Sequence, residues 1–184
     1  MTDLAEVERV RRIRAGERDA CAQMVHVHYE AVYRFLVRLS RDPHLAEDLT
    51  QETFVAGWRG VRELGAPASL RSWLHRIAYN KYIDVCRRDR RGQDMTIAVG
   101  NERRDLTVAD PGEHIEKEEA ASRLEAAVES LDDKHRLVIT LHYMQDLSFR
   151  EMAEVLDEPT GTVKARTHEA LNRLRARLAV GVNR

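Results

Sequence analysis

Leu147-Ser-Phe-Arg-Glu-Met-Ala-Glu-Val-Leu156 is the stretch that decides the fold of the C-terminal part of the chain. Ser148 is followed three residues later by Glu151, the spacing of a capping box at the start of a helix. Apolar side chains then recur at intervals of three and four, which predicts one buried helix face. Pro159 ends this pattern because proline cannot continue a helix. The sequence therefore predicts a short helix and a tight turn.

A second helix is expected to start at Thr160 or Gly161, and it carries more basic than acidic residues. Two helices joined by a tight turn form a helix-turn-helix, whose second helix enters the major groove by its N-terminal residues. An ordinary helical hairpin is the alternative. The side chains expected to contact DNA here are Thr160, Thr162, Lys164, Arg166, Thr167, Glu169 and Arg173.

The rest of the sequence also predicts helices. Asp42 precedes Pro43, a pairing of N-cap residue and first-turn proline that begins helices. Ser69 can cap a helix that begins at Leu70. Apolar residues elsewhere recur at three and four, with no convincing strand periodicity. We therefore predict an all-α fold of two small helical domains.

A change of composition separates these two domains. Residues 92–122 contain eight acidic and three basic residues, four Gly or Pro residues and few bulky apolar ones. Such a composition is typical of a flexible linker, and the end of the stretch is expected to start the next helix. The predicted boundaries are 1–91, 92–118 and 119–184.

The distribution of charge supports this division. The whole chain has 30 Lys and Arg against 31 Asp and Glu, so it is not basic overall. Residues 59–91, however, hold nine basic and three acidic residues, and residues 160–184 hold six and one. Two basic segments on either side of an acidic tether indicate two contacts with a polyanion. Two solvated helix faces would give the same counts.

Several other classes of protein do not fit. Two cysteines, Cys21 and Cys86, are too few for a disulfide-rich secreted scaffold, and neither has metal-ligand spacing. The sequence shows no signal-peptide pattern and no apolar stretch of the length of a membrane span. The eight histidines do not form a ligand set, and no catalytic constellation is visible. We expect a cytoplasmic protein that is not an enzyme and binds no metal or cofactor.

Three stretches of the C-terminal part form a recognisable set. They are Leu131-Asp-Asp-Lys-His-Arg-Leu-Val-Ile-Thr-Leu141, the stretch from Ser148 to Leu156, and Gly161-Thr-Val-Lys-Ala-Arg166. Together they resemble region 4 of the extracytoplasmic-function sigma factors. The N-terminal part resembles region 2 of the same family. The matching residues there are Leu45-Ala-Glu-Asp-Leu-Thr-Gln-Glu-Thr-Phe54, Ser69-Leu-Arg-Ser-Trp-Leu-His-Arg-Ile-Ala-Tyr-Asn80, Asp84 and Arg87-Arg88.

This resemblance implies a dissociable subunit of bacterial RNA polymerase. Region 2 would bind the β′ clamp coiled coil and melt the promoter −10 element, and region 4 would read the −35 element as duplex and meet the β flap. The implied polymerase-binding residues are Glu47, Asp48, Gln51 and Glu52. The implied −10 contacts are Ser69, Leu70, Arg71, Arg76, Asn80, Lys81, Arg87 and Arg88. An anti-sigma protein is a further expected partner.

Two other functions remain open at this point. A stand-alone helix-turn-helix regulator would explain the C-terminal motif, but it usually needs a dimer and gives no reason for acidic residues 47–52. A helical interaction protein without a nucleic-acid role would explain the helices alone. The short helix expected within residues 1–16 has no predicted role.

Overall fold

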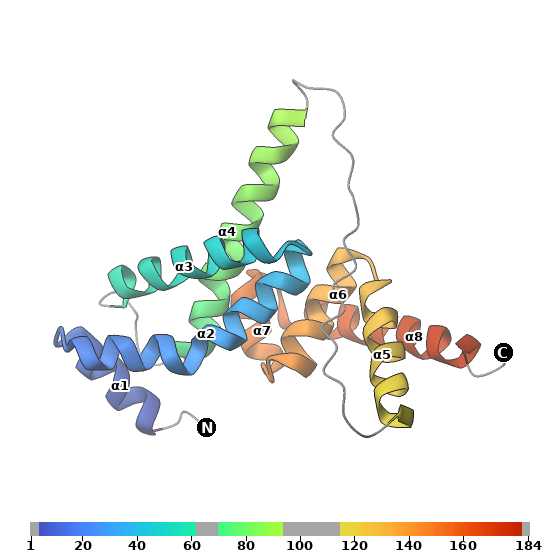
Figure 1. Cartoon of the computed structure of the whole chain (residues 1–184), viewed down its shortest axis with the longest axis horizontal. Helices are drawn as coiled ribbons and strands as arrows, with labels where there is room; N and C mark the ends of the chain where they lie inside the picture. The colour runs from blue at the N-terminus through green and yellow to red at the C-terminus, as the bar shows by residue number, and fades with distance from the viewer. Residues whose placement is uncertain (1–3, 62–69, 94–114, 182–184) are drawn as a thin grey trace.

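The computed structural model describes residues 4–61, 70–93 and 115–181, and within these ranges the chain forms helices (Figure 1). The all-α prediction is confirmed. In chain order the elements are α1 (Leu4–Arg14), α2 (Arg18–Ser40), α3 (Pro43–Gly60), α4 (Leu70–Gln93), α5 (Ile115–Glu129), α6 (Asp133–Ile139), the π-helix η1 (Thr140–Met144), α7 (Phe149–Leu156) and α8 (Thr160–Gly181). Over the described ranges, no helix has the length and apolar character to cross a membrane.

The predicted helix starts lie where the sequence placed them. The Asp42 carboxylate accepts hydrogen bonds from the backbone N–H groups of His44 (2.9 Å) and Leu45 (3.2 Å). At α7, the Glu151 backbone N–H donates to Ser148 Oγ, and Glu151 Oε2 accepts from the Ser148 backbone N–H at 2.8 Å. These bonds satisfy donors that a helix start otherwise leaves unpaired. Helix α4 begins at Leu70 as expected, but its predicted cap, Ser69, lies outside the described residues.

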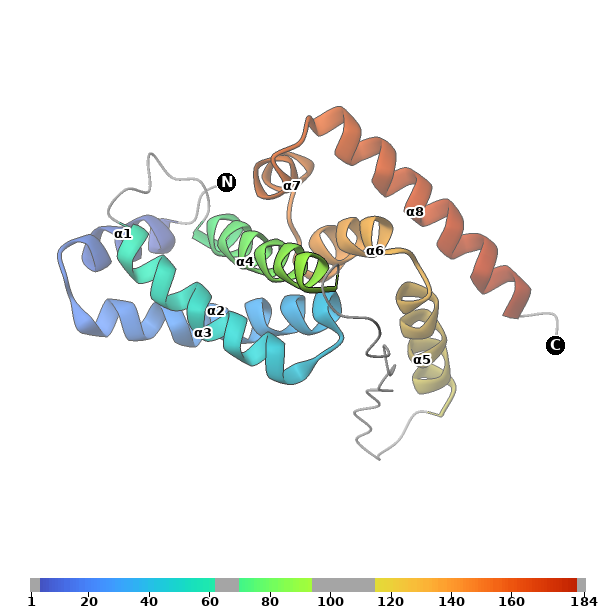
Figure 2. The ribbon, with the colours of Figure 1, turned by 90° about the horizontal axis from the view of Figure 1, so that it is seen from above.

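The N-terminal helices pack around α2. Helices α3 and α4 both lie against it, and α1 packs on its N-terminal half (Figures 1 and 2). Phe35 and Leu36 of α2 are completely buried, as is Leu74 of α4. The Tyr82 hydroxyl of α4 donates to the backbone oxygen of Leu39 at 3.0 Å. Burial of these side chains is the main source of stability in this part of the chain.

In the C-terminal part, α8 runs alongside α6 and α7 meets its N-terminal end (Figure 2). Helix α6 continues without a break into η1, where the Gln145 backbone N–H donates to the Thr140 oxygen five residues earlier at 3.0 Å. No local sequence pattern predicts this wider turn. It brings Leu141 and Gln145 into buried positions.

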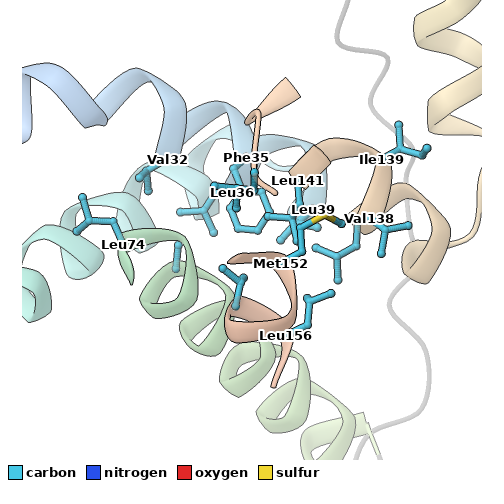
Figure 3. Close-up of a cluster of buried hydrophobic side chains, with 14 of the residues drawn as sticks. Val32, Phe35, Leu36, Leu39, Leu74, Val138, Ile139, Leu141, Met152 and Leu156 are labelled. Atoms are coloured by element: carbon cyan, nitrogen blue, oxygen red, sulfur yellow. The ribbon is translucent and has the colours of Figure 1, made fainter. Parts of the chain in front are cut away.

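The two helical parts share one core. Figure 3 shows α2 side chains, including Phe35 and Leu39, together with Leu74 of α4, Leu141 of η1 and Met152 of α7. Helix α7 of the C-terminal part lies against α4 of the N-terminal part. The two predicted helical domains are therefore also packed against each other, because apolar surface on both is buried between them.

Polar groups also cross this boundary. His75 Nε2 of α4 lies 3.2 Å from the side-chain oxygen of Gln145, and both residues are buried. Arg136 Nε donates to the backbone oxygen of Arg38 at 3.1 Å. Arg41 donates to the backbone oxygen of Glu129 at 2.6 Å. The first two bonds satisfy buried groups that are costly to leave unpaired, whereas the third lies at the surface.

The predicted linker, 92–118, falls mostly outside the described residues. Its first two residues belong to the end of α4, and residues 115–118 belong to α5. The domain boundaries therefore stay a prediction.

Candidate nucleic-acid interface

The acidic residues predicted to bind polymerase lie on the exposed side of α3. Glu47, Asp48, Gln51 and Glu52 are all exposed, while Leu49 and Thr50 of the same turn are buried. We call these four residues the acidic patch. Exposed Val55 and Trp58 continue along the same helix, and Trp58 retains 60% of its surface.

The acidic patch is joined to α4 by an ion pair. Lys81 Nζ lies 2.8 Å from Glu52 Oε2, and the Lys81 side chain is largely covered. Lys81 was expected to contact DNA, but it is already neutralised in this structure. Among the described side chains of α4, the basic ones that stay exposed are Arg76, Arg87 and Arg88. Arg87 approaches Asp84 to only 3.8 Å, and Arg88 donates to the Asp84 backbone oxygen.

Two of the predicted DNA contacts lie in the core. Leu70 has no exposed surface. Thr167 is 2% exposed, and its hydroxyl donates to the Val163 backbone oxygen at 2.8 Å. Both positions fall on the inner faces of their helices, so neither side chain can reach DNA here. The structure corrects the sequence interpretation at these two residues.

Between α4 and the turn that joins α7 to α8 lies an open hollow of about 400 Å³. Arg76 of α4 lines one side and Glu154, Asp157 and Glu158 line the other. Closer to the N-terminal end of α4, Arg71 lies 3.8 Å from Asp146. Carboxylates of the helix-turn-helix thus face cations of α4. The Glu158 charge and burial together raise the pKa of Tyr79, burial being the larger cause.

The predicted residues of α8 separate into two groups. Thr160, Thr162 and Lys164 are exposed at its N-terminal end, with Lys164 Nζ lying 5.8 Å from the centre of the Phe149 ring. Arg166 instead pairs with Glu158 at 2.8 Å and is mostly covered. The remaining two predicted contacts, Glu169 and Arg173, pair with each other on the flank that faces α6.

The outward face of α8 carries residues that the sequence interpretation missed. Ala165, His168 and Asn172 are exposed, and they lie opposite buried Val163 and Ala170 on the helix. The apolar periodicity of α8 was the signal that could have found them, because a face with no large apolar residue is the one left for a partner. Lys164 and Arg175 flank this face.

Cysteine and histidine form no second site among the described residues. No group of three possible metal ligands occurs there, and Cys21 and Cys86 are separate, half-buried thiols. Two histidines are instead packed in the N-terminal core. Burial lowers the pKa of His28 to about 4 and also lowers the pKa of His75.

Comparison with known proteins agrees with this geometry. Residues 24–92 match the family model for sigma-70 region 2, and residues 127–176 match the model for sigma-70 region 4. The ECF RNA polymerase sigma factor SigW of Bacillus subtilis is 31% identical over 178 residues, covering 93% of this chain and 95% of that protein. The ECF RNA polymerase sigma factor SigL of Mycobacterium tuberculosis is 32% identical and covers 96% and 99%.

The chain belongs to the ECF RNA polymerase sigma factors. Among solved structures, the sigma factor RpoE in complex with the anti-sigma factor NepR from Bartonella quintana matches with a TM-score of 0.74 and 25% identity, covering 89% of this chain and 98% of that one. CnrH in complex with the cytosolic domain of CnrY has the same fold, with a TM-score of 0.70 at 24% identity over 96% and 98% of the two chains.

The family match gives the helices their roles. In this sigma factor, region 2 comprises α2–α4 and region 4 comprises the helices from the end of α5 through most of α8. Helix α1 precedes the region 2 match and packs on it through buried Ile13. A sigma factor directs RNA polymerase to promoters, so region 2 and region 4 are the parts that meet promoter DNA.

Proposed function

We propose that this sigma factor docks on core RNA polymerase through the acidic patch of α3. Four neighbouring exposed polar side chains, three of them acidic, suit a basic partner such as the β′ clamp coiled coil. Glu47 and Asp48 support the proposal most directly, because they are exposed and carry no ion pair among the contacts described above. The patch lies on region 2, beside the helix expected to take DNA.

The same proposal assigns a type of DNA to each basic helix. Arg76, Asn80, Arg87 and Arg88 of α4 would hold the melted −10 strand, with the arginines on phosphates and Asn80 on a base edge. Thr160, Thr162 and Lys164 at the N-terminal end of α8, together with outward-facing His168, would meet the −35 duplex. Melting needs no hydrolysis if the protein binds the separated strand better than the duplex. The protein therefore acts in the cytoplasm, beside polymerase, without catalysing a reaction itself.

An anti-sigma factor is the further partner that we propose. RpoE and CnrH, which share this fold, are known in complexes with NepR and CnrY. An inhibitor that covers the acidic patch would prevent polymerase binding. Such an inhibitor would compete with core polymerase for this chain. Adding it to the complex should therefore displace this chain from core polymerase.

Titration of the full chain against bacterial core polymerase tests the proposal. We expect submicromolar binding by the wild type, and a loss of about ten- to a hundredfold when Glu47→Lys and Asp48→Lys are combined. The matched control reverses two exposed acids away from α3, with Asp19→Lys and Glu129→Lys, and should bind within about threefold of the wild type.

Failure of the folded wild type to bind core polymerase at low salt would contradict the proposal. A stand-alone helix-turn-helix regulator would then be the better account. Equal losses in the test and control variants would show that net charge, rather than the acidic patch, controls binding.

A further inference from the structure

A cluster of four polar residues joins the start of α6 to the middle of α8. Asp132 and His135 belong to the start of α6, and Glu169 and Arg173 lie one turn apart on α8. We call these residues the α6–α8 cluster. Figure 2 shows that the two helices lie side by side. Two members, Glu169 and Arg173, are residues that the sequence assigned to DNA.

The distances show that the contacts between the four side chains form a closed ring, which we call the circuit. His135 Nδ1 lies 2.7 Å from Asp132 Oδ1, and His135 Nε2 lies 3.5 Å from Glu169 Oε2. Arg173 completes it, with one nitrogen 2.8 Å from Asp132 Oδ2 and another 2.5 Å from Glu169 Oε1. Every member therefore contacts two others, and two of the four contacts cross from α6 to α8.

His135 occupies the inside of this circuit. Only 8% of its surface is exposed, and Nε2 is buried without a hydrogen bond of good geometry. Asp132 is also the N-cap of α6, because its carboxylate accepts from the His135 backbone N–H at 3.1 Å. The cluster therefore links the start of α6 to one position along α8, the turn that contains Glu169 and Arg173.

Both carboxylates are ionised at neutral pH. A hydrogen bond from Arg173, and then the nearby His135 ring, lower the pKa of Glu169. Partial burial opposes ionisation of Asp132, but hydrogen bonds from His135 outweigh it and lower its pKa. The Arg173 guanidinium is shared between them in the planar geometry that suits arginine. Glu169 and Arg173 are thus satisfied by the protein itself.

We propose that the α6–α8 cluster positions the recognition helix, so that Glu169 and Arg173 contribute to −35 binding by holding α8 rather than by touching bases. His135 is the central positioning residue. This rests on the proposed reading of the −35 element by α8. An orientation error at a helix disturbs all the contacts at its reading end together, whereas loss of a direct contact changes one base or one phosphate.

Two DNA probes separate these possibilities, both bound by core polymerase carrying the full chain. The first, the selected duplex, is obtained by selection of a randomised library with the wild-type holoenzyme. The second, the fork probe, has a single-stranded −10 segment and no upstream duplex. His135→Leu removes both ring contacts, and His135→Gln retains an amide able to donate toward Glu169. Lys134→Ala changes an exposed neighbour outside the cluster and is the control.

We expect His135→Leu to weaken binding to the selected duplex at least fivefold, with binding to the fork probe unchanged within twofold. His135→Gln should recover part of the loss, and Lys134→Ala should behave as the wild type. Base preference should stay the same in every variant. Arg173→Gln, at a more exposed position, gives a second test: if Arg173 only braces α8, the salt dependence of duplex binding keeps its slope, whereas a lost phosphate contact lowers the slope by about one.

Three results would overturn the proposal. One is full duplex binding by both His135→Leu and Arg173→Gln. Another is a Glu169→Gln variant whose preferred base changes at a single position, which would make Glu169 a direct reader. The third is a lower salt slope in Arg173→Gln. A wild-type holoenzyme that selects no upstream sequence would instead show that the proposed function of region 4 is wrong.

Discussion

Helices α4 and α8 are both long and basic, yet they use their charges differently. In α4, Lys81 pairs with Glu52 of α3 and Arg71 approaches Asp146. Three other cations, Arg76, Arg87 and Arg88, stay exposed, and their contacts with acidic residues are weak or local. In α8, Arg166 and Arg173 are tied to carboxylates from outside the helix. Residues 160–184 contain one acidic residue, but Glu158 and Asp132 neutralise two of their cations. The number of cations that can meet DNA thus depends on ion pairs between different helices. The net charge of a sequence segment does not reveal these pairs.

The helices differ in burial as well. Helix α4 is covered on one side by α2 and α3 and on another by α7, so it contacts both regions. Helix α8 packs on the elements of region 4.

The two regions also differ in the ionisable side chains that they bury. Region 2 holds two histidines whose pKa values are lowered by burial, whereas region 4 buries Arg136 with hydrogen bonds to Arg38, Leu131 and Asp133.

The largest expected effect tests the greater burial of α4. Leu74→Ala should lower the free energy of unfolding by about 2–5 kcal/mol, because Leu74 is fully buried and its removal leaves a cavity. Leu174→Ala, at a position of α8 that keeps 6% of its surface, should cost less. Denaturant unfolding followed by circular dichroism measures both. If Leu174→Ala lowers the free energy of unfolding more than Leu74→Ala does, α4 is not the more deeply buried of the two helices.

Acid should destabilise the protein through region 2. The folded-state pKa of His28 is about 4, below the usual value of 6.5 for the unfolded chain. Between these values the unfolded state binds more protons, so stability is full above pH 6.5 and falls as the pH drops toward 4. The loss attributable to His28 is at most about 3 kcal/mol. Unfolding midpoints measured from pH 7.5 to pH 4 should decline less in His28→Leu than in the wild type. Equal slopes in the two proteins would show that this histidine is not buried in its neutral form.

A smaller effect concerns α7, the helix through which region 4 meets α4. Ser148→Ala removes one half of the capping box and should lower stability by about 1 kcal/mol. Binding to core polymerase should stay unchanged, since the acidic patch is on another helix. A thermal or denaturant melt measures the first quantity, and the polymerase titration measures the second. Loss of polymerase binding at full stability would show that the start of α7 belongs to the surface with which region 4 is expected to meet the β flap.

The sequence predicted the all-α fold and the helix starts at Pro43 and Phe149, because these depend on local caps and helical periodicity. The two family regions were predicted from the resemblance of their motifs to those of the sigma factors. It could not predict that Lys81 pairs with Glu52 or that Arg173 pairs with Asp132, because these partners are 29 and 41 residues apart. It also missed η1 and the shared core, which arise from packing between distant elements rather than from local propensity. Leu70 and Thr167 were assigned to DNA by motif position, and burial excluded them.

Helices α4 and α8 are proposed to hold different forms of promoter DNA with different exposed cations. The most direct measurement compares two holoenzymes on the fork probe and the selected duplex. We predict that Arg87→Glu combined with Arg88→Glu weakens binding to the fork probe at least tenfold and binding to the selected duplex less than twofold. Lys164→Glu should show the reverse pattern. If both variants weaken both probes to the same extent, the division of DNA binding between the two helices is wrong.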